Sequence, residues 1–222
     1  MADYPQLLER IRNLAKAIRA ICDDGLTCEI APCASESDVL AVESEIGRPL
    51  PDILRDFFLN CSAKIDFDWL LDERRLGREL PQVFQKVTFG AFTFDLSMAE
   101  TDWINWTGWQ HCIEHPENYA GDAYRYRFDQ LYPVLSTVNG DVIAVVTSGD
   151  DHGRIVYLDH EGGDMDEAIL AEDFDSFIDT WVNLCCPGPE SWLLEPFYDA
   201  DLRRLSATCN NALTWRSLIG LA

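Results

Sequence analysis

The sequence predicts an α+β domain with an antiparallel or mixed β-sheet, a β-meander at its centre and flanking helices. Three short apolar runs rich in β-branched residues are typical of strands and cover residues 131–138, 142–147 and 155–158. Asn139-Gly140, between the first two runs, suits a tight hairpin, and a longer glycine-bracketed loop joins the last two. A helical pattern at residues 172–182 begins with acidic residues, as the helix dipole favours, and is expected to cover the one face of the sheet that needs covering.

The amino-terminal segment is expected to form an amphipathic helix at residues 4–21. Its apolar residues recur at alternating spacings of four and three, which places them on one stripe: Leu7, Ile11, Leu14, Ile18 and Ile21. The other side of this helix is basic, and two interpretations follow from that. The helix either docks a partner or packs on the acidic body of its own chain. Residues 26–31 are then expected to form an edge strand.

Two short helices that meet at a rigid corner are expected next. Ser35 begins a capping sequence and Gly47 ends the first of these helices. Pro51 suits the first turn of the second helix, where its missing N–H costs nothing.

Two strands and a longer helix separate this corner from the meander. Residues 63–70 and 89–96 alternate between apolar and polar, as half-buried strands do, so Asp66 and Asp68 are expected to face the same way. Residues 97–114 have a helical pattern with a tryptophan at every third position from Trp103 to Trp109. This spacing indicates either core packing or a stacking platform.

The remaining segments complete the predicted organisation. Residues 73–81 are expected to form a loop and residues 189–198 a short helix, and residues 201–221 are expected to form an amphipathic helix through Leu202, Leu205, Leu213 and Leu218. The chain then divides into an N-terminal helix and edge segment (1–34), an α+β domain (35–186) and a C-terminal helical extension packed on the same domain (187–222).

The charge of the chain restricts its partners. The formal net charge is -22, from 17 Lys and Arg against 39 Asp and Glu. Direct contact with nucleic acid needs a basic surface, so nucleic acid is excluded as a direct partner, and an anionic membrane is excluded for the same reason. A basic protein partner would be attracted and steered by this charge, while the alternative is that the charge only keeps the protein soluble.

Cysteine usage and hydropathy predict a cytoplasmic protein. The eight cysteines stand at irregular spacings with no C-x-x-C, which favours reduced, mostly buried thiols over a disulfide scaffold. The first residues contain charges and no continuous apolar region, so we expect no signal peptide, and no apolar run is long enough for a spanning helix.

One local motif suggests metal chemistry. His111, Glu114 and His115 fit the H-x-x-E-H pattern of inverted zinc peptidases, in which two histidines bind zinc beside a general base. Pro116 disfavours helical geometry at His115, and no obvious downstream helix supplies the third protein ligand that a catalytic zinc needs. A zinc-dependent hydrolase is therefore a remote alternative, and the sequence predicts no enzyme, no cofactor and no metal.

Two further groups of histidines and carboxylates lie in the meander. Asp150-Asp151-His152 falls in a hairpin loop, and Asp159-His160-Glu161 follows the last predicted strand. A histidine beside carboxylates can act as acid, base or ligand, but spacing identifies no nucleophile here, and solvated turns are the alternative.

The order of these elements resembles that of the SUKH superfamily, which includes the fungal cell-wall synthesis regulator and many bacterial proteins. The resemblance covers residues 35–184 and rests on Glu43-x-x-Ile46-Gly47-x-x-Leu50-Pro51, Phe57-Phe58, Trp69, Tyr132-Pro133-Val134, Gly140-Asp141, Gly153-x-Ile155-Val156-Tyr157-Leu158 and Asp173-Phe174-x-x-Phe177. For a bacterial member, it implies an immunity protein that binds and silences a specific toxin, often a nuclease. A nuclease is basic, so a strongly acidic inhibitor complements it.

The partner surface is expected to consist of acidic residues on exposed strands and hairpin loops. The candidates are Asp66, Asp68, Asp141, Asp150, Asp151, Asp159 and Glu161. The alternative function, implied by the fungal relatives, is a regulatory scaffold with several partners.

Overall fold

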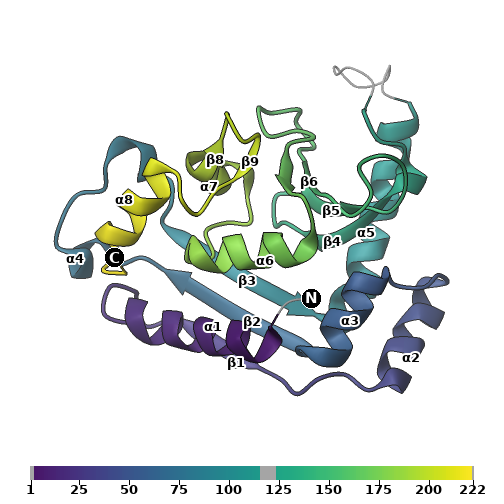
Figure 1. Cartoon of the computed structure of the whole chain (residues 1–222), viewed down its shortest axis with the longest axis horizontal. Helices are drawn as coiled ribbons and strands as arrows, with labels where there is room; N and C mark the ends of the chain where they lie inside the picture. Colours follow the sequence, from purple (N-terminus) through teal and green to yellow (C-terminus); the bar gives the residue numbers. More distant parts are fainter. Residues whose placement is uncertain (1–2, 116–123, 222) are drawn as a thin grey trace.

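A computed structural model describes residues 3–115 and 124–221 and confirms the α+β class (Figure 1). All named strand pairs are antiparallel. The first sheet contains β1 (Thr27–Ile30), β2 (Lys64–Leu70) and β3 (Phe89–Asp95), and the second contains β4 (Leu131–Ser136), β5 (Val142–Val146), β6 (Ile155–Leu158) and β7 (Ile169–Ala171), each in chain order. A small ribbon pairs β8 (Tyr198–Asp199) with β9 (Arg204–Leu205).

The helices surround these sheets. Those in the described residues are α1 (Tyr4–Ile18), α2 (Glu36–Ile46), α3 (Asp52–Asn60), α4 (Glu73–Leu76), α5 (Ala99–Glu114), α6 (Phe174–Asn183), α7 (Ser191–Leu194) and α8 (Asn210–Leu218). The predicted capping of α2 is present, because Ser35 and Asp38 form a capping box and Gly47 ends the helix with a left-handed backbone. The apolar stripe of α1 is buried in the main core, which agrees with a helix that packs on its own chain.

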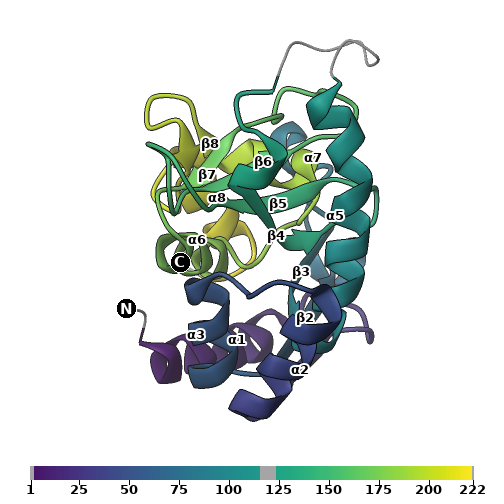
Figure 2. The same ribbon diagram turned by 90° about the vertical axis from the view of Figure 1, so that its right-hand side faces the viewer.

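The second sheet is buried on both faces, whereas the sequence pattern had predicted that only one face is covered. All residues of β5 are buried. Ile143 and Val145 belong to the main core with α6, while Val142, Ala144 and Val146 belong to a second core with Trp106 and Trp109 of α5. Figure 2 shows α5 and α6 on opposite sides of β4 and β5. The tryptophans of α5 therefore act in core packing.

The first sheet has one buried and one open face. Ile65, Phe67 and Trp69 of β2 are buried, and the residues between them keep part of their surface exposed. The sequence predicted this alternation correctly. The indole of Trp69 stacks on Trp215 of α8 with ring centroids 6.2 Å apart, and its Nε1 donates a hydrogen bond of 2.9 Å to the carbonyl of Cys185. The end of the chain thus packs on the inner face of the first sheet.

Two predicted segments differ in the structure. Residues 73–81 contain the short helix α4, because the Asp72 side chain accepts hydrogen bonds from the backbone of Arg74 and Arg75 and caps it. The last helix begins at Asn210 and not at residue 201. Asp199 accepts backbone hydrogen bonds from residues 201 and 202 and holds the turn between β8 and β9.

This shift changes which residues of the C-terminal segment are buried. Leu202 and Leu213 are exposed, although the sequence pattern had placed them on the apolar side. Ala212, Trp215 and Ile219 face the core instead. The predicted strands also omitted β7, whose three residues are too few for a periodic pattern.

Candidate protein-binding surface

The acidic residues predicted to bind a partner fall in three places. Asp66 and Asp68 lie on the open face of the first sheet. Asp141, Asp159 and Glu161 lie at one end of the second sheet, because Val142 pairs with Leu158, and Asp150 and Asp151 lie in the loop at its other end. β5 separates these last two groups, so the structure does not bring all seven residues together.

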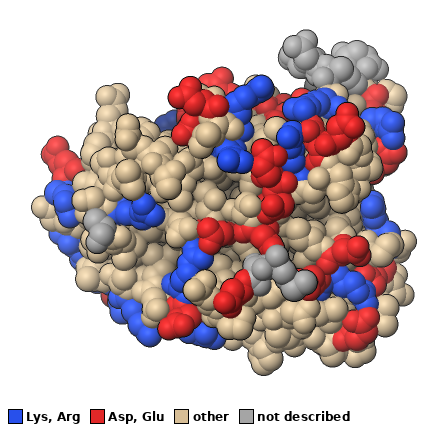
Figure 3. Space-filling view, viewed as in Figure 1, with Lys and Arg blue, Asp and Glu red and all other residues tan. Residues whose placement is uncertain are grey.

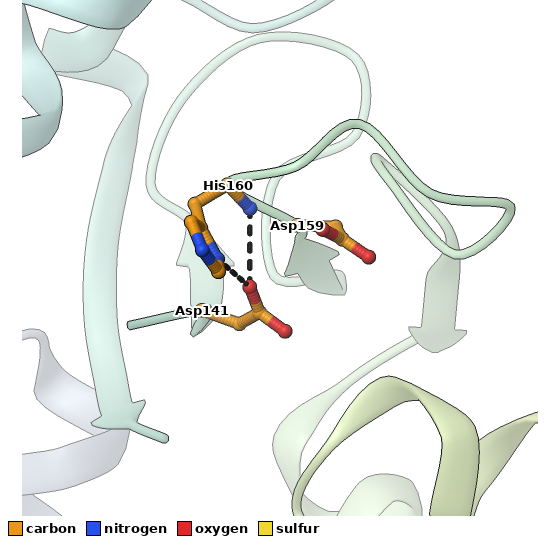
Figure 4. A group of neighbouring side chains, drawn as sticks. All are labelled: Asp141, Asp159 and His160. Atoms are coloured by element: carbon orange, nitrogen blue, oxygen red, sulfur yellow. Dashed lines mark hydrogen bonds and ion pairs between the residues drawn. The ribbon is translucent and has the colours of Figure 1, made fainter. Parts of the chain in front are cut away.

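Asp141 is inside the protein. Its exposed fraction is 0%. Its Oδ1 accepts hydrogen bonds from the backbone N–H and Nδ1 of His160, at 3.1 and 2.6 Å (Figure 4). Its Oδ2 accepts from Nδ2 of Asn139 and the hydroxyl of Tyr157. Burial raises the pKa of Asp141, but these hydrogen bonds outweigh it and lower the pKa overall. Asp141 was expected to be exposed but is buried, so we do not include it in the partner surface.

The same group of side chains has the composition of a metal site. Asp141, Asp159 and His160 each place one potential ligand atom within 4.8 Å of the others. Both oxygens of Asp141 already accept hydrogen bonds, however, and Oδ1 of Asp159 accepts one from the backbone of Glu161. The arrangement suits an ion pair between His160 and Asp141 that joins the β4–β5 turn to the segment after β6. Glu161 itself is 83% exposed at the side chain.

Asp151 is also engaged within the chain. Its carboxylate forms ion pairs with Arg125, at 2.6 Å, and with Arg154, and it accepts a hydrogen bond from the hydroxyl of Tyr126. Arg154 continues this network to Glu172 at 2.9 Å. The charge of Asp151 is therefore balanced by its own chain, whereas the neighbouring Asp150 is exposed.

The face of the molecule that carries α1 and α6 has charges of both signs. Acidic side chains run over α6, with basic side chains beside them (Figure 3). Arg10 of α1 forms an ion pair of 2.5 Å with Asp179 of α6. Asp173 accepts a hydrogen bond from the backbone of Ser176 and caps the helix. Asp173 and Asp179 on this face therefore stabilise α6 and its contact with α1.

The open face of the first sheet has an excess of carboxylates. Asp66 lies opposite Glu29 in the register of β1 and β2, and Asp95 lies opposite Lys64 in the register of β2 and β3. Asp68 lies on the same face, since strand residues two apart point to the same side. Lys64 approaches Asp66 at 3.6 Å and Asp95 at 3.7 Å. We call this surface, Glu29, Lys64, Asp66, Asp68 and Asp95, the acidic sheet face.

Burial and the neighbouring carboxylate of Asp66 raise the pKa of Asp68. Burial raises its pKa to about 6, and hydrogen bonding and charge repulsion from Asp66 act in the same direction. Glu29 and Asp95 had not been identified from the sequence. The alternation of residues 89–96 contains the signal for Asp95, because it places this residue opposite to Phe92 and Phe94.

A cavity of about 300 Å³ opens beside the acidic sheet face, between β3 and β4. Asp68, Asp95 and Asp102 contribute carboxylates to its lining, and Leu50, Leu54 and Phe58 contribute apolar surface. Val138, in the turn after β4, also lines this cavity and is 97% exposed. We call it the intersheet cavity.

The H-x-x-E-H motif occupies the end of α5. The rings of His111 and His115 have centroids 4.9 Å apart, so the two histidines do come together. Glu114 accepts a hydrogen bond from Gln110. Over residues 3–115 and 124–221, these histidines do not belong to a group of three or more metal-ligating side chains, while a catalytic zinc needs three protein ligands.

The cysteines are free thiols. Burial raises the pKa of Cys185 to about 12 and raises that of the adjacent Cys186 well above its usual value. A thiol of this kind stays protonated and unreactive at neutral pH. The vicinal pair therefore serves packing.

None of the helices in the described parts of the chain is long and apolar enough to cross a bilayer.

Comparison with known proteins identifies the family. Comparisons with curated proteins and with solved structures give no match. The model of the SMI1 / KNR4 family (SUKH-1) matches residues 33–180, which is most of the chain and agrees with the extent of the resemblance seen in the sequence. The chain therefore belongs to the SMI1 / KNR4 family (SUKH-1).

Proposed function

We propose that this protein is a non-enzymatic immunity protein that binds and neutralises a basic toxin, such as a nuclease, through the acidic sheet face. Family membership supports an immunity or regulatory role. The observation that carries the proposal is the composition of this face, which carries four carboxylates, Glu29, Asp66, Asp68 and Asp95, and one ammonium group, that of Lys64. A net charge of -22 adds long-range attraction for a cationic protein.

Inhibition would take place by occlusion. An enzyme that acts on nucleic acid holds its substrate with Lys and Arg side chains, and an acidic surface competes for the same groups. Complementary charge mainly accelerates association, whereas a slow dissociation rate depends on buried apolar contacts. Leu70 and Val138 supply exposed apolar surface, the first at the end of β2 and the second at the mouth of the intersheet cavity.

The test is a capture experiment followed by an activity assay. The purified protein would be immobilised and presented with extract from its native host, with the neighbouring reading frame co-expressed, at low and at high salt. The expected result is one basic protein retained under both conditions, whose toxic activity is blocked by an equimolar amount of this protein. An empty capture, or a retained enzyme that stays fully active, contradicts the proposal.

Surface variants locate the contact. Asp66→Asn with Asp95→Asn removes two charges from the acidic sheet face and is expected to slow association about tenfold at low ionic strength. Glu9→Gln with Glu45→Gln makes the same change in net charge at exposed positions on α1 and α2 and serves as the matched control. Equal association rates for both double variants would mean that the partner binds elsewhere.

The alternative is a regulatory scaffold, and membership of this family supports it as well. Such a protein would retain several unrelated partners weakly, and high salt would remove them. The capture experiment separates these functions, because an immunity protein retains a single partner tightly.

A further inference from the structure

Two carboxylates of the intersheet cavity have no cationic neighbour among the residues that the structure describes. Lys64 approaches Asp95 at 3.7 Å, but neither Asp68 nor Asp102 forms an ion pair with any described residue. Burial is the main cause that raises the pKa of Asp102, and it also raises the pKa of Asp68. A partly desolvated carboxylate without a counter-ion is costly, and a cation that enters the cavity would offset this cost.

A buried hydroxyl group gives an independent indication of a ligand. Tyr132 of β4 lines the cavity and is only 2% exposed. Its hydroxyl has no hydrogen-bond partner within the described part of the chain. Its ring is held in place, because Trp103 stacks on it at 5.5 Å. Buried hydroxyls are normally paired, so an unpaired one in a cavity wall marks a position where a ligand group completes the bonding.

The size and apolar part of the lining restrict the ligand. A volume of about 300 Å³ is at the lower end of the range for small-molecule sites, so the cavity suits one long side chain. Leu50, Leu54 and Phe58 can contact an aliphatic stem. An arginine offers such a stem and ends in a planar group with five N–H donors, which suits several acceptors around it better than a point charge does.

We propose that the intersheet cavity receives an arginine side chain of the protein partner, with its guanidinium group donating to Asp68, Asp102 and the hydroxyl of Tyr132. This inference rests on the proposed function for the existence of a basic partner. The arginine would be the central anchor of the interface, and the acidic sheet face would form its charged surroundings. Exposed Val138 at the mouth of the cavity would cover the stem of this arginine.

The test uses N-acetyl-arginine amide as a probe for the isolated protein. A titration followed by backbone amide NMR is expected to shift the signals of Ala91, Thr93 and Val138, which line the cavity. N-acetyl-citrulline amide has nearly the same shape without the charge and should produce no such shifts. Shifts scattered over the surface, or equal shifts with both probes, would overturn the proposal.

Variants of the lining test the assigned contacts. Asp102→Asn and, separately, Tyr132→Phe are expected to weaken probe binding by about tenfold and severalfold, because a hydrogen bond to a charged group is worth more than a neutral one. Glu9→Gln on α1 should leave binding unchanged. The amide spectrum without probe shows whether each variant is folded. If a variant is not folded, Asp68→Asn is tested in its place. Unchanged affinity in the folded variants rules the cavity out.

The same variants separate this inference from the proposed function. Should a basic partner bind wild type and Asp102→Asn equally well, the protein acts as an immunity protein but the arginine does not enter this cavity. Should the probe bind in the cavity while no basic partner is captured, the site exists and the proposed function is wrong.

Discussion

The carboxylate of Asp141 accepts a hydrogen bond of 2.6 Å from Nδ1 of His160, across 19 positions of the chain. The pair connects the turn between β4 and β5 with the segment that follows β6. Hydrogen bonding to Asp141 is the main cause that raises the pKa of His160. The stability of this end of the second sheet should therefore depend on pH.

The direction of this dependence follows from linkage. A histidine whose folded pKa is raised contributes stability that is complete below its unfolded pKa, about 6.5, and is lost as the pH rises through the folded value. We expect His160→Gln to lower the free energy of unfolding more at pH 5 than at pH 9. Urea unfolding of both proteins at these two pH values measures the difference. An equal effect at both values would show that the imidazole acts only through its neutral form.

Replacing Asp141 should be costly because its carboxylate is buried and accepts a hydrogen bond from the buried hydroxyl of Tyr157. Asp141→Asn retains one acceptor oxygen and turns an NH₂ group toward either Tyr157 or His160. We expect a loss of about 2–4 kcal/mol in the free energy of unfolding. Glu161→Gln is the control, since an exposed position should change stability by less than about 0.5 kcal/mol. Comparable results for the two variants would contradict the structural role of Asp141.

Asp68 and Asp66 provide a second test by titration. The Asp68 side-chain carboxyl signal in ¹³C NMR should titrate near pH 6, and Asp66→Asn should lower this pKa toward the ordinary value of about 4. Because the folded pKa is raised, the folded state binds more protons than the unfolded state between these values, so Asp68 reduces stability as pH rises from about 4 to 6. An Asp68 pKa near 4 in the wild type would show that burial and the neighbouring Asp66 do not raise the pKa of Asp68.

Two glycines should respond to alanine in opposite directions. A Cβ at Gly90 would lie 2.5 Å from Nε1 of Trp69 and would overlap the carbonyl oxygen of Cys186, so Gly90→Ala should destabilise strongly. Gly108 is in α5 with nothing within 4 Å of such a Cβ, and Gly108→Ala should stabilise by about 0.5–1 kcal/mol. Thermal unfolding measures both changes. If Gly90→Ala left the stability unchanged, the backbone at Gly90 would not lie as close to Trp69 and Cys186 as the structure shows.

The sequence predicted strands best where one face is open. Residues 63–70 alternate because one side of β2 meets the core and the other meets water. Residues 142–146 are apolar throughout, and a continuous apolar run is typical of a strand buried on both faces. That pattern was available in the sequence, but it does not say which helix supplies the second layer, and α5 comes from an earlier part of the chain.

The candidate site was less accessible to sequence analysis. Asp141 follows Asn139-Gly140, and such a turn normally indicates an exposed residue, but Tyr157 and His160 enclose this one. Asp68 and Asp102 line the same cavity although 34 positions separate them, and no local pattern predicts that they share a cavity. Family membership was predictable because it depends on the order of many short elements, each read locally.

The hydrogen bond from Trp69 to the carbonyl of Cys185, with the stacking of Trp215 on the same indole, has a practical consequence for protein engineering. The family match stops at residue 180, so both partners of Trp69 come from sequence beyond it. A fragment trimmed to the matched residues would expose a large aromatic ring and leave its N–H without an acceptor. We therefore expect such a fragment to aggregate when expressed, and transplanting this domain into another protein would require the last forty residues or so as well.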